Sequence, residues 1–289
     1  MNEKIFSASE LEDYLLCPYR FYARSILKLK PAFEWSLELT PVEIGNLIHH
    51  ILDYFLKKKE ASKKFLLDTL ETEMRRLHEE RPQLLLVLLE RQKKRIARTL
   101  LSFLEQYQCE QKERKSLKPR YLEWAFDDLV IENAMGDPIR LRGRIDRIDV
   151  DPVNKRFLVI DYKTGSTKIT GNQIIQGKSL QLPLYILAVQ RTLLPDYEPI
   201  GALYYQLSDM TRNKGLLHAE RLPEDLQIHP RSSSLIPAAR WEETFQLIEE
   251  RVRTIVAEIR KGVFTSHAEP CEAYCPYKDI CKIRASKEA

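Results

Sequence analysis

Two apolar-rich runs in the middle of the chain, residues 139–150 and 156–162, constrain the fold more than any other feature. A short segment with the Asp, Pro and Asn residues of a turn joins them. Side chains in a strand alternate between its two faces, so Asp161 and Lys163 should share one face. If the two runs pair as a hairpin, Asp146 returns close to Asp161.

Two carboxylates and a lysine that converge at a strand end form a candidate site for a divalent metal ion. Carboxylate oxygens suit Mg²⁺ or Mn²⁺. Such an ion would polarise a phosphate group and help to generate hydroxide from water. Lys163 would orient that water or stabilise the developing negative charge. An Asp-x-Lys triplet by itself is more often a strand end with solvated charges, so this interpretation depends on the residues around it.

The composition sets the broad class of the protein. A chain of 289 residues with 44% hydrophobic content can form one large domain or two small ones. A formal charge of +4 gives no global signal for nucleic acid, which must then come from local clusters. The N-terminus lacks an apolar secretory core, and no apolar run is long enough to span a bilayer. We therefore expect a soluble, cytoplasmic protein with no membrane partner.

Four of the five cysteines lie near the ends of the chain. Residues 7–10 have a capping-box pattern that predicts a helix, and Cys17 after it would by itself be a small buried hydrophobic residue. The other three form a cluster in the tail: Cys271, Cys275 and Cys281. Four thiolates suit a [4Fe–4S] cluster or a zinc ion, and zinc sites more often split two and two. Cys109 is expected to be unligated.

Residues 42–117 should be mostly helical, because charged residues alternate there with Leu and Ile at helix-like intervals. His49 lies in this region, and a lone His on a helix is more often structural than a ligand. Of three basic clusters here, one has no acidic residue within it and is the better candidate for contact with phosphates; a solvated helix face is the equal alternative. The candidate DNA-binding residues of that cluster are Arg91, Lys94, Arg95 and Arg98.

The second half of the chain should mix strands and helices. Gln181 and Tyr185 lie four apart on one face of an expected helix, where packing alone could explain them. The expected elements are a strand at 121–132, a polar loop at 166–176, a helix at about 179–194, a strand at 199–207 and an amphipathic helix at 240–262.

The residues around the acidic pair resemble a known nuclease family. Gly143 begins a Gly-x-x-Asp-Arg-x-Asp segment, and Asp161 begins an Asp-Tyr-Lys-Thr-Gly segment. These segments are similar to the central strands of the PD-(D/E)XK nucleases, and within them to the RecB-like exonuclease branch. Four further elements of that branch occur in the expected order: Cys-Pro at Cys17, Gly-x-x-x-His ending at His49, Gln-x-x-x-Tyr from Gln181 to Tyr185, and the cysteine tail.

The resemblance implies an α/β fold that is restriction-endonuclease-like, with a mixed β-sheet flanked by helices. It implies a single domain over residues 1–289, a helical region at 42–117, and a collar formed by residues 1–30 and 265–283. The roles that it implies are as follows: Mg²⁺ or Mn²⁺ ligands His49, Asp146, Asp161 and the carbonyl of Tyr162, and catalytic residues Asp146, Asp161, Lys163, Gln181 and Tyr185.

The cysteines resemble those of AddB-type and CRISPR-associated adaptation nucleases, in which an iron–sulfur cluster staples the C-terminus to the N-terminus. The resemblance therefore implies a [4Fe–4S] cluster on Cys17, Cys271, Cys275 and Cys281. It predicts a metal-dependent DNA nuclease, expected to be an exonuclease on single-stranded ends in DNA repair or recombination. The alternatives are a CRISPR adaptation-type nuclease and a non-catalytic module that binds DNA ends or a helicase. No ATPase motor motif is visible, which makes a helicase or repair partner an expectation.

Overall fold

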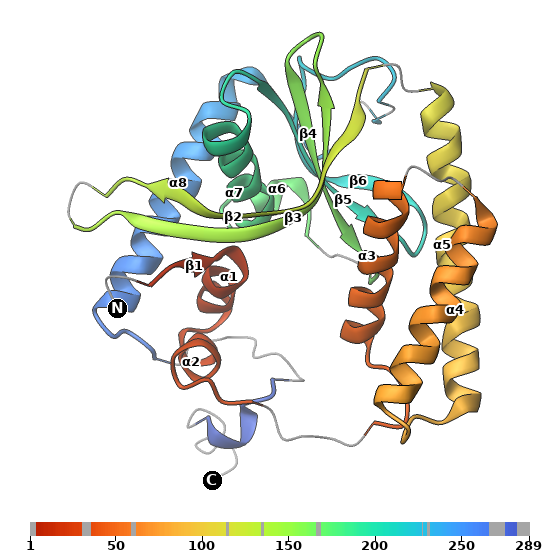
Figure 1. Ribbon diagram of the computed structural model, residues 1–289. Coiled ribbons are helices and arrows are strands. Elements are labelled where there is room, and N and C mark those ends of the chain that lie inside the picture. Colours follow the sequence, from red (N-terminus) through yellow and green to blue (C-terminus); the bar gives the residue numbers. More distant parts are fainter. Residues whose placement is uncertain are drawn as a thin grey trace.

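A computed structural model of the protein describes residues 4–30, 36–58, 62–113, 116–133, 136–165, 169–226, 228–229, 232–265 and 275–281. Within these residues, seven strands form one mixed sheet with helices on both faces (Figure 1). The strands are β1 (Phe6–Ser7), β2 (Lys118–Ile131), β3 (Ile139–Asp151), β4 (Arg156–Lys163), β5 (Glu198–Gln206), β6 (Thr211–His218) and β7 (Leu235–Ile236). The α-helices are α1 (Ala8–Leu16), α2 (Pro18–Phe21), α3 (Pro41–Lys58), α4 (Lys63–Glu80), α5 (Leu86–Glu113), α6 (Gly171–Ile175), α7 (Gln181–Ala188) and α8 (Ala238–Arg260). Shorter helical segments are η1 (Tyr22–Ile26), η2 (Val189–Leu193) and η3 (Lys278–Ile280).

Strand β3 organises the pairing of the sheet. β2 pairs with it antiparallel along almost its whole length. β1 pairs with it in parallel at Leu141 and Arg142, and β4 pairs antiparallel from Arg147 to Asp151. The sheet then continues through β5, β6 and β7. Residues 143–146 of β3 therefore lie between the segments that pair with β1 and with β4, so the sheet is interrupted beside Asp146.

Two apolar clusters attach the helices to opposite faces of the sheet. In β4, Phe157 and Val159 belong to the cluster that includes α1, α7 and α8. Leu158 and Ile160 belong to the cluster that includes α3, α4 and α5. This alternation is the pattern of a strand buried on both faces. Asp161, the next odd-numbered position, is accordingly directed toward α7.

Most of the expected elements are present. β3 and β4 form the expected hairpin, and α3, α4 and α5 fill the region expected to be helical. The mixed α/β architecture is confirmed. The polar loop expected at 166–176 is wrong in part, because α6 lies within it. Thr170 and Gln173 form a capping box there, which stabilises a helix of only five residues.

The two ends of the described chain meet on one side of the molecule (Figure 1). Tyr14 of α1 donates a hydrogen bond to the carbonyl of Val263, at 2.7 Å. Phe264 stacks on Tyr22, with 4.9 Å between ring centroids. The start of the chain is thus packed against the segment that follows α8. Among the described helices, none combines the length and apolar character needed to cross a membrane.

Candidate active site

The candidate site lies where β3 and β4 separate. Their pairing ends at Arg147 and Ile160, whereas the pairing of β4 with β5 on its other edge runs from Arg156 to Lys163. Beyond the end of this pairing, the side chain of Asp146 still connects the two strands, because its Oδ2 accepts a hydrogen bond from the backbone N–H of Tyr162 at 2.7 Å. Asp146 is thereby fixed against the strand that carries Asp161.

Asp161 and Lys163 lie on the α7 side of the sheet, with Gln181 above them. Lys163 Nζ is 2.6 Å from Asp161 Oδ2. Gln181 joins both groups, since its Nε2 donates to Asp161 Oδ1 at 2.8 Å and its Oε1 accepts from Lys163 Nζ at 3.2 Å. Gln181 Nε2 also lies 3.1 Å from the hydroxyl of Tyr185, one turn further along α7. The four predicted residues therefore form one connected network.

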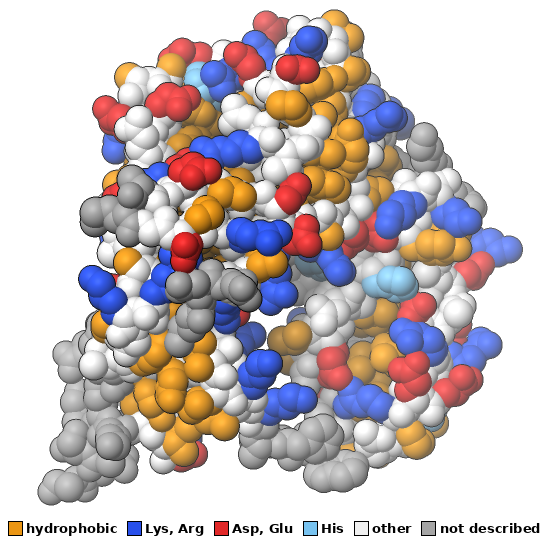
Figure 2. All heavy atoms as spheres, turned by 60° about the vertical axis from the view of Figure 1, so that its left-hand side comes forward, with side chains coloured by type: hydrophobic (Ala, Val, Ile, Leu, Met, Phe, Trp, Pro, Cys, Tyr) orange, Lys and Arg blue, Asp and Glu red, His pale blue; other side chains and the backbone are white. Residues whose placement is uncertain are grey.

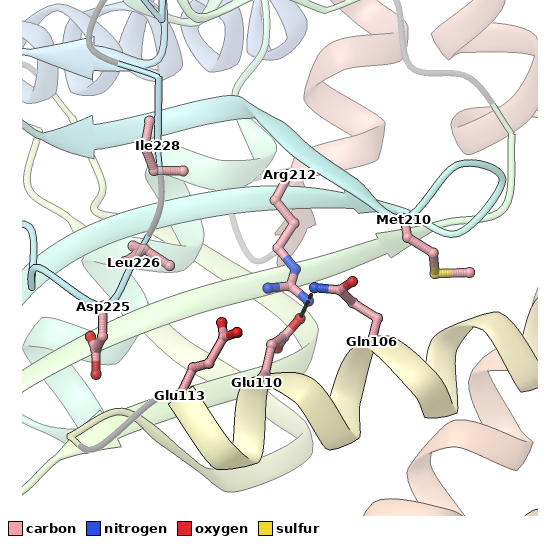
Figure 3. A pocket seen from close by; sticks show the side chains of 8 residues that line it. All are labelled: Gln106, Glu110, Glu113, Met210, Arg212, Asp225, Leu226 and Ile228. Atoms are coloured by element: carbon pink, nitrogen blue, oxygen red, sulfur yellow. Dashed lines mark hydrogen bonds and ion pairs between the residues drawn. The ribbon is translucent and has the colours of Figure 1, made fainter.

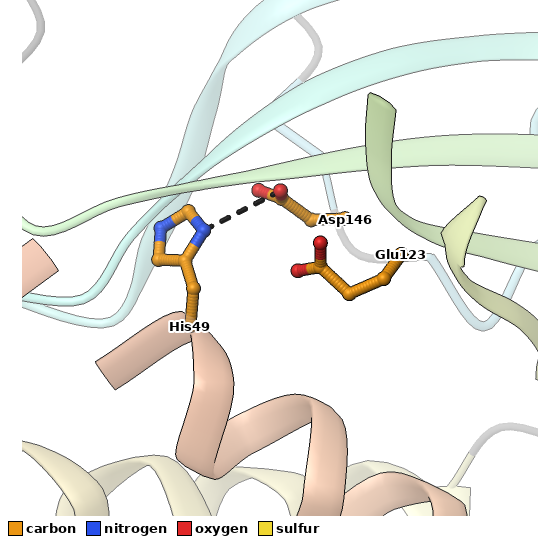
Figure 4. Close-up of side chains that lie close together, drawn as sticks. All are labelled: His49, Glu123 and Asp146. Atoms are coloured by element: carbon orange, nitrogen blue, oxygen red, sulfur yellow. Dashed lines mark ion pairs between the residues drawn. The ribbon is translucent and has the colours of Figure 1, made fainter. Parts of the chain in front are cut away.

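Helix α3 brings His49 to the other side of Asp146 (Figure 4). His49 Nδ1 lies 3.4 Å from Asp146 Oδ1. Gly45, one turn before His49, lets α3 approach the end of β4 closely: a Cβ at this position would lie 3.2 Å from Thr164 Oγ1. The Gly-x-x-x-His pattern thus has a steric reason, because a larger residue at its first position would push His49 away from the sheet.

Glu123 of β2 is part of the site and was not predicted. One ligand atom each from His49, Glu123 and Asp146 all lie within 4.8 Å of one another, a spacing that one metal ion could bridge (Figure 4). Leu122 pairs with Arg147 and Trp124 with Ile145, so Glu123 lies opposite Asp146. Its backbone is in the left-handed region, with φ of 48°. A residue without glycine's freedom is strained there, and such strain is frequent at functional sites.

The charges of the site affect one another strongly. Burial raises the pKa of Asp161 to about 6, although the ammonium of Lys163 acts against this shift. Burial, followed by the charge of Asp146, also raises the pKa of Glu123. Burial alone would lower the pKa of His49, but its hydrogen bond to Asp146 and the nearby carboxylates raise it. Three carboxylates beside an imidazole form a donor set that fits a hard divalent cation.

A buried ion pair supports the site from β3. Arg147, 1% exposed, holds both carboxylate oxygens of Asp149, at 2.5 and 2.7 Å. Its third contact is the hydroxyl of Tyr162 on β4, at 3.4 Å. The two-pronged geometry is the favourable one for Arg and a carboxylate. These contacts join β3 to β4 directly beside the two acidic residues of the site, Asp146 and Asp161.

Three of the four predicted cluster cysteines belong to the described residues, and Cys271 lies outside them. Cys17, Cys275 and Cys281 all act electrostatically on the hydroxyl of Tyr19, whose pKa burial and these thiols raise. The same hydroxyl donates to the carbonyl of Ile280, at 2.9 Å. The three thiols therefore all lie near this hydroxyl, which joins α2 to the last described segment.

The predicted DNA-binding residues are all exposed on α5: Arg91, Lys94, Arg95 and Arg98. A second basic feature was not predicted. It is a cavity of about 360 Å³ beside the cysteines, lined by Arg20, Arg24, Lys28, Leu29, Lys30, Pro276 and Tyr277. Figure 2 shows Lys and Arg side chains around a hollow in the face that it draws.

Another polar pocket, of about 180 Å³, lies between α5 and β6 (Figure 3). Arg212 extends into it, forms an ion pair with Glu110, and stacks on Tyr205 at 4.0 Å from the ring centroid. Gln106 donates to the same carboxylate at 3.2 Å. These contacts between lining side chains attach α5 to the sheet.

Comparisons with known proteins agree with this geometry. The sequence model of the PD-(D/E)XK nuclease superfamily matches residues 5–282. The chain is also similar to proteins named as one subunit of an ATP-dependent helicase/deoxyribonuclease. The one from Clostridium novyi (strain NT) is 26% identical over 99% of this chain and 31% of its own length. The one from Alkaliphilus oremlandii (strain OhILAs) is 26% identical over 96% and 30%. The chain thus spans less than a third of these relatives.

Proposed function

The chain belongs to the PD-(D/E)XK nuclease superfamily, and from this we propose that it is a divalent-metal-dependent DNA nuclease of DNA repair. We further propose that it acts as an exonuclease on single-stranded ends. The observation that carries the proposal is the convergence of His49, Glu123 and Asp146, with the Asp161–Lys163 pair on the next strand, at the point where two strands separate. A module that only binds DNA ends or a partner would not need these acidic and imidazole groups together with the lysine.

In this proposal His49, Asp146 and Asp161 hold Mg²⁺ or Mn²⁺, with Glu123 beside them and the carbonyl of Tyr162 as a further ligand. When bound, the ion would polarise the scissile phosphate and lower the pKa of a water molecule. The imidazole must be neutral and the carboxylates deprotonated to bind it. Burial chiefly raises the pKa values of Asp161 and Glu123, and the charge of Asp146 adds to both shifts; a cation bound there would act in the opposite direction.

Lys163 would hold the attacking water and stabilise the charge that develops on the phosphate. Gln181 keeps that ammonium in place through its Oε1, while its Nε2 restricts Asp161. Tyr185 closes the network beside Gln181. Gly143 makes room first for the Phe126 ring and then for the Tyr185 ring, because a Cβ there would lie 2.7 Å from the former and 3.1 Å from the latter.

We propose a [4Fe–4S] cluster on Cys17, Cys271, Cys275 and Cys281. The convergence of the three described thiols around Tyr19 fits a cluster that joins both ends of a single domain, residues 1–289. Tyr277 adds a second tie to the same region, because its hydroxyl donates to the carbonyl of Leu29 at 2.9 Å. A zinc ion on the same thiolates is the alternative.

The proposed DNA contacts are the cations of α5 and the basic cavity beside the cysteines. Arg24 and Arg20 share Asp13 at 2.8 and 3.1 Å, whereas Lys28 and Lys30 are exposed. Cations of this kind bind the phosphate backbone without reading its sequence. Because the relatives are named as part of a helicase/deoxyribonuclease, we also propose a helicase partner for this chain.

The test is a digest of DNA labelled at the 5′ or the 3′ end, single- and double-stranded, with Mg²⁺ or Mn²⁺. The wild type should shorten single strands from an end, and Lys163→Ala should be at least about 100-fold slower. Lys261→Ala, which removes an exposed lysine at the end of α8, is the matched control and should cleave normally. A folded Lys163→Ala protein that digests DNA at the wild-type rate would overturn the assignment.

A further inference from the structure

The N-terminus of α7 has no cap of its own. The residue at its cap position is Leu180, and Leu180 has no side-chain group that can accept a hydrogen bond from the helix. The first N–H groups of a helix have no partner within the helix, and a buried one is costly unless something accepts from it. Gln181 is the first residue of this helix, so its backbone position depends on what completes the turn.

A carboxylate from a distant part of the sequence supplies the missing cap. Oε1 of Glu12, on α1, accepts hydrogen bonds from the N–H of Leu180 at 2.7 Å and the N–H of Gln181 at 3.1 Å. It also accepts from the hydroxyl of Ser179 at 2.9 Å. A negative charge at a helix N-terminus is favourable because the helix dipole is positive there. Hydrogen bonds to a charged acceptor are also the stronger kind.

The capped backbone includes that of Gln181, whose side chain belongs to the candidate active site. Glu12 fixes the backbone of Gln181, and the side chain of the same residue contacts Asp161 and Lys163. Movement of that backbone would carry the Gln181 amide out of reach of both groups. We propose that Glu12 is a positioning residue of the active site, which holds Gln181 in register with Lys163. The inference rests on the proposed nuclease function for its catalytic consequence, but not for its structural part.

The proposal separates Glu12 from the metal site. The hydrogen bonds of Glu12 go to residues 179–181 and not to the metal-site residues His49, Asp146, Asp161 and Glu123. Its loss can reach these residues only through the hydrogen bond from Gln181 to Asp161, so it should change Mn²⁺ affinity far less than it changes kcat. The reacting groups, in contrast, tolerate little misplacement, since a shift of about 1 Å can cost about 100-fold in rate. We therefore expect Glu12→Ala to lower kcat about 10- to 100-fold on single-stranded DNA, with KM changed far less.

Two further variants distinguish positioning from a general loss of stability. Glu12→Gln keeps a carbonyl oxygen that can accept the same hydrogen bonds, and should recover most of the rate. Glu10→Ala is the matched control on the same helix: Glu10 accepts from the N–H of Ser7 at 2.9 Å and pairs with Lys4 at 2.8 Å. Its loss weakens α1 without touching α7, so it should lower the melting temperature while kcat stays unchanged.

Amide exchange followed by NMR tests the cap without any activity. In Glu12→Ala the backbone amides of Leu180 and Gln181, and the side-chain amide of Gln181, should exchange at least about tenfold faster than in wild type. Unchanged exchange, or a kcat within twofold of wild type, would overturn the proposal, as would an equal fall in kcat for Glu10→Ala. A wild type that cleaves no DNA would refute the nuclease function, and the exchange of the Gln181 side chain would then decide the positioning role alone.

Discussion

Asp161 is buried, so its negatively charged form is costly, and the proposed metal ion would stabilise that form. Its pKa rises from an ordinary 3.8 to about 6 in the folded, metal-free protein, chiefly because burial penalises its charged form. The folded state therefore holds this proton more tightly than the unfolded chain does. The stability that this adds is present below about pH 4 and is lost as the pH rises through 6.

The resulting prediction compares Asp161→Asn with the wild type. An amide does not ionise, so the metal-free variant should be more stable than wild type at pH 8, by up to about 3 kcal/mol, and the difference should shrink toward pH 4. Urea unfolding in the presence of a chelator measures it. Adding Mn²⁺ should raise the stability of the wild type and leave the stability of the variant unchanged. A variant that is no more stable at pH 8 would contradict the burial of this charge.

At the scale of the strands, β3 and β4 depend on the ion pair between Arg147 and Asp149. Replacing Arg147 with Met would leave a fully buried carboxylate without its cation, at a cost of about 3–5 kcal/mol in the free energy of unfolding. The double variant Arg147→Met with Asp149→Leu should regain most of this loss, because no charge then remains unpaired. Urea unfolding again gives the values, and a loss below about 1 kcal/mol for the single variant would contradict this account.

The same elements show what the sequence could predict about the site. Asp161 and Lys163 are two residues apart in one strand, so alternation alone places them on one face, and they are indeed in contact. Gln181 was found through the family resemblance and not through any local pattern. Glu123 was missed because its place opposite Asp146 depends on the register of two strands and on an unusual backbone angle. No short-range sequence pattern predicts the strand register or the backbone angle.

Glu12 was missed for the same reason, because its contact also depends on how elements pack, here over a longer sequence separation. Glu12 and Gln181 are separated by most of the nuclease core in sequence, and only the packing of α1 against α7 brings them together. The helix α6 was missed for a different reason, since Thr170 and Gln173 did carry a readable capping signal within a stretch that otherwise resembled a loop. Element types are thus readable from local patterns, whereas contacts between elements are not.

At the scale of the whole molecule, the proposed collar would join the two ends of the chain. Cys281→Ser should lower the melting temperature by at least about 5 °C, because loss of a bound cluster removes a link that stabilises the folded state. Mn²⁺ affinity should change less than twofold, since other residues form that site. Cys109→Ser is the matched control, because Cys109 is exposed on α5 and should be neutral.

Spectroscopy of the same proteins identifies the group held by the collar. Anaerobically purified wild type should be brown, with iron bound and broad absorption near about 400 nm, as [4Fe–4S] proteins are. Cys281→Ser should lose most of this absorption. A colourless wild type with stoichiometric zinc would replace the cluster with a zinc staple, and unchanged melting of Cys281→Ser would remove the structural role.

The central claim is that one divalent ion joins α3 to the ends of β3 and β4. A crystal structure with Mn²⁺, in which anomalous scattering locates the metal, tests this claim most directly. The account predicts one strong peak within about 2.0–2.5 Å of the imidazole of His49 and of carboxylate oxygens of Asp146 and Asp161. A crystal grown with saturating Mn²⁺ that shows no peak there would contradict the claim. So would one in which these three side chains do not share one ion.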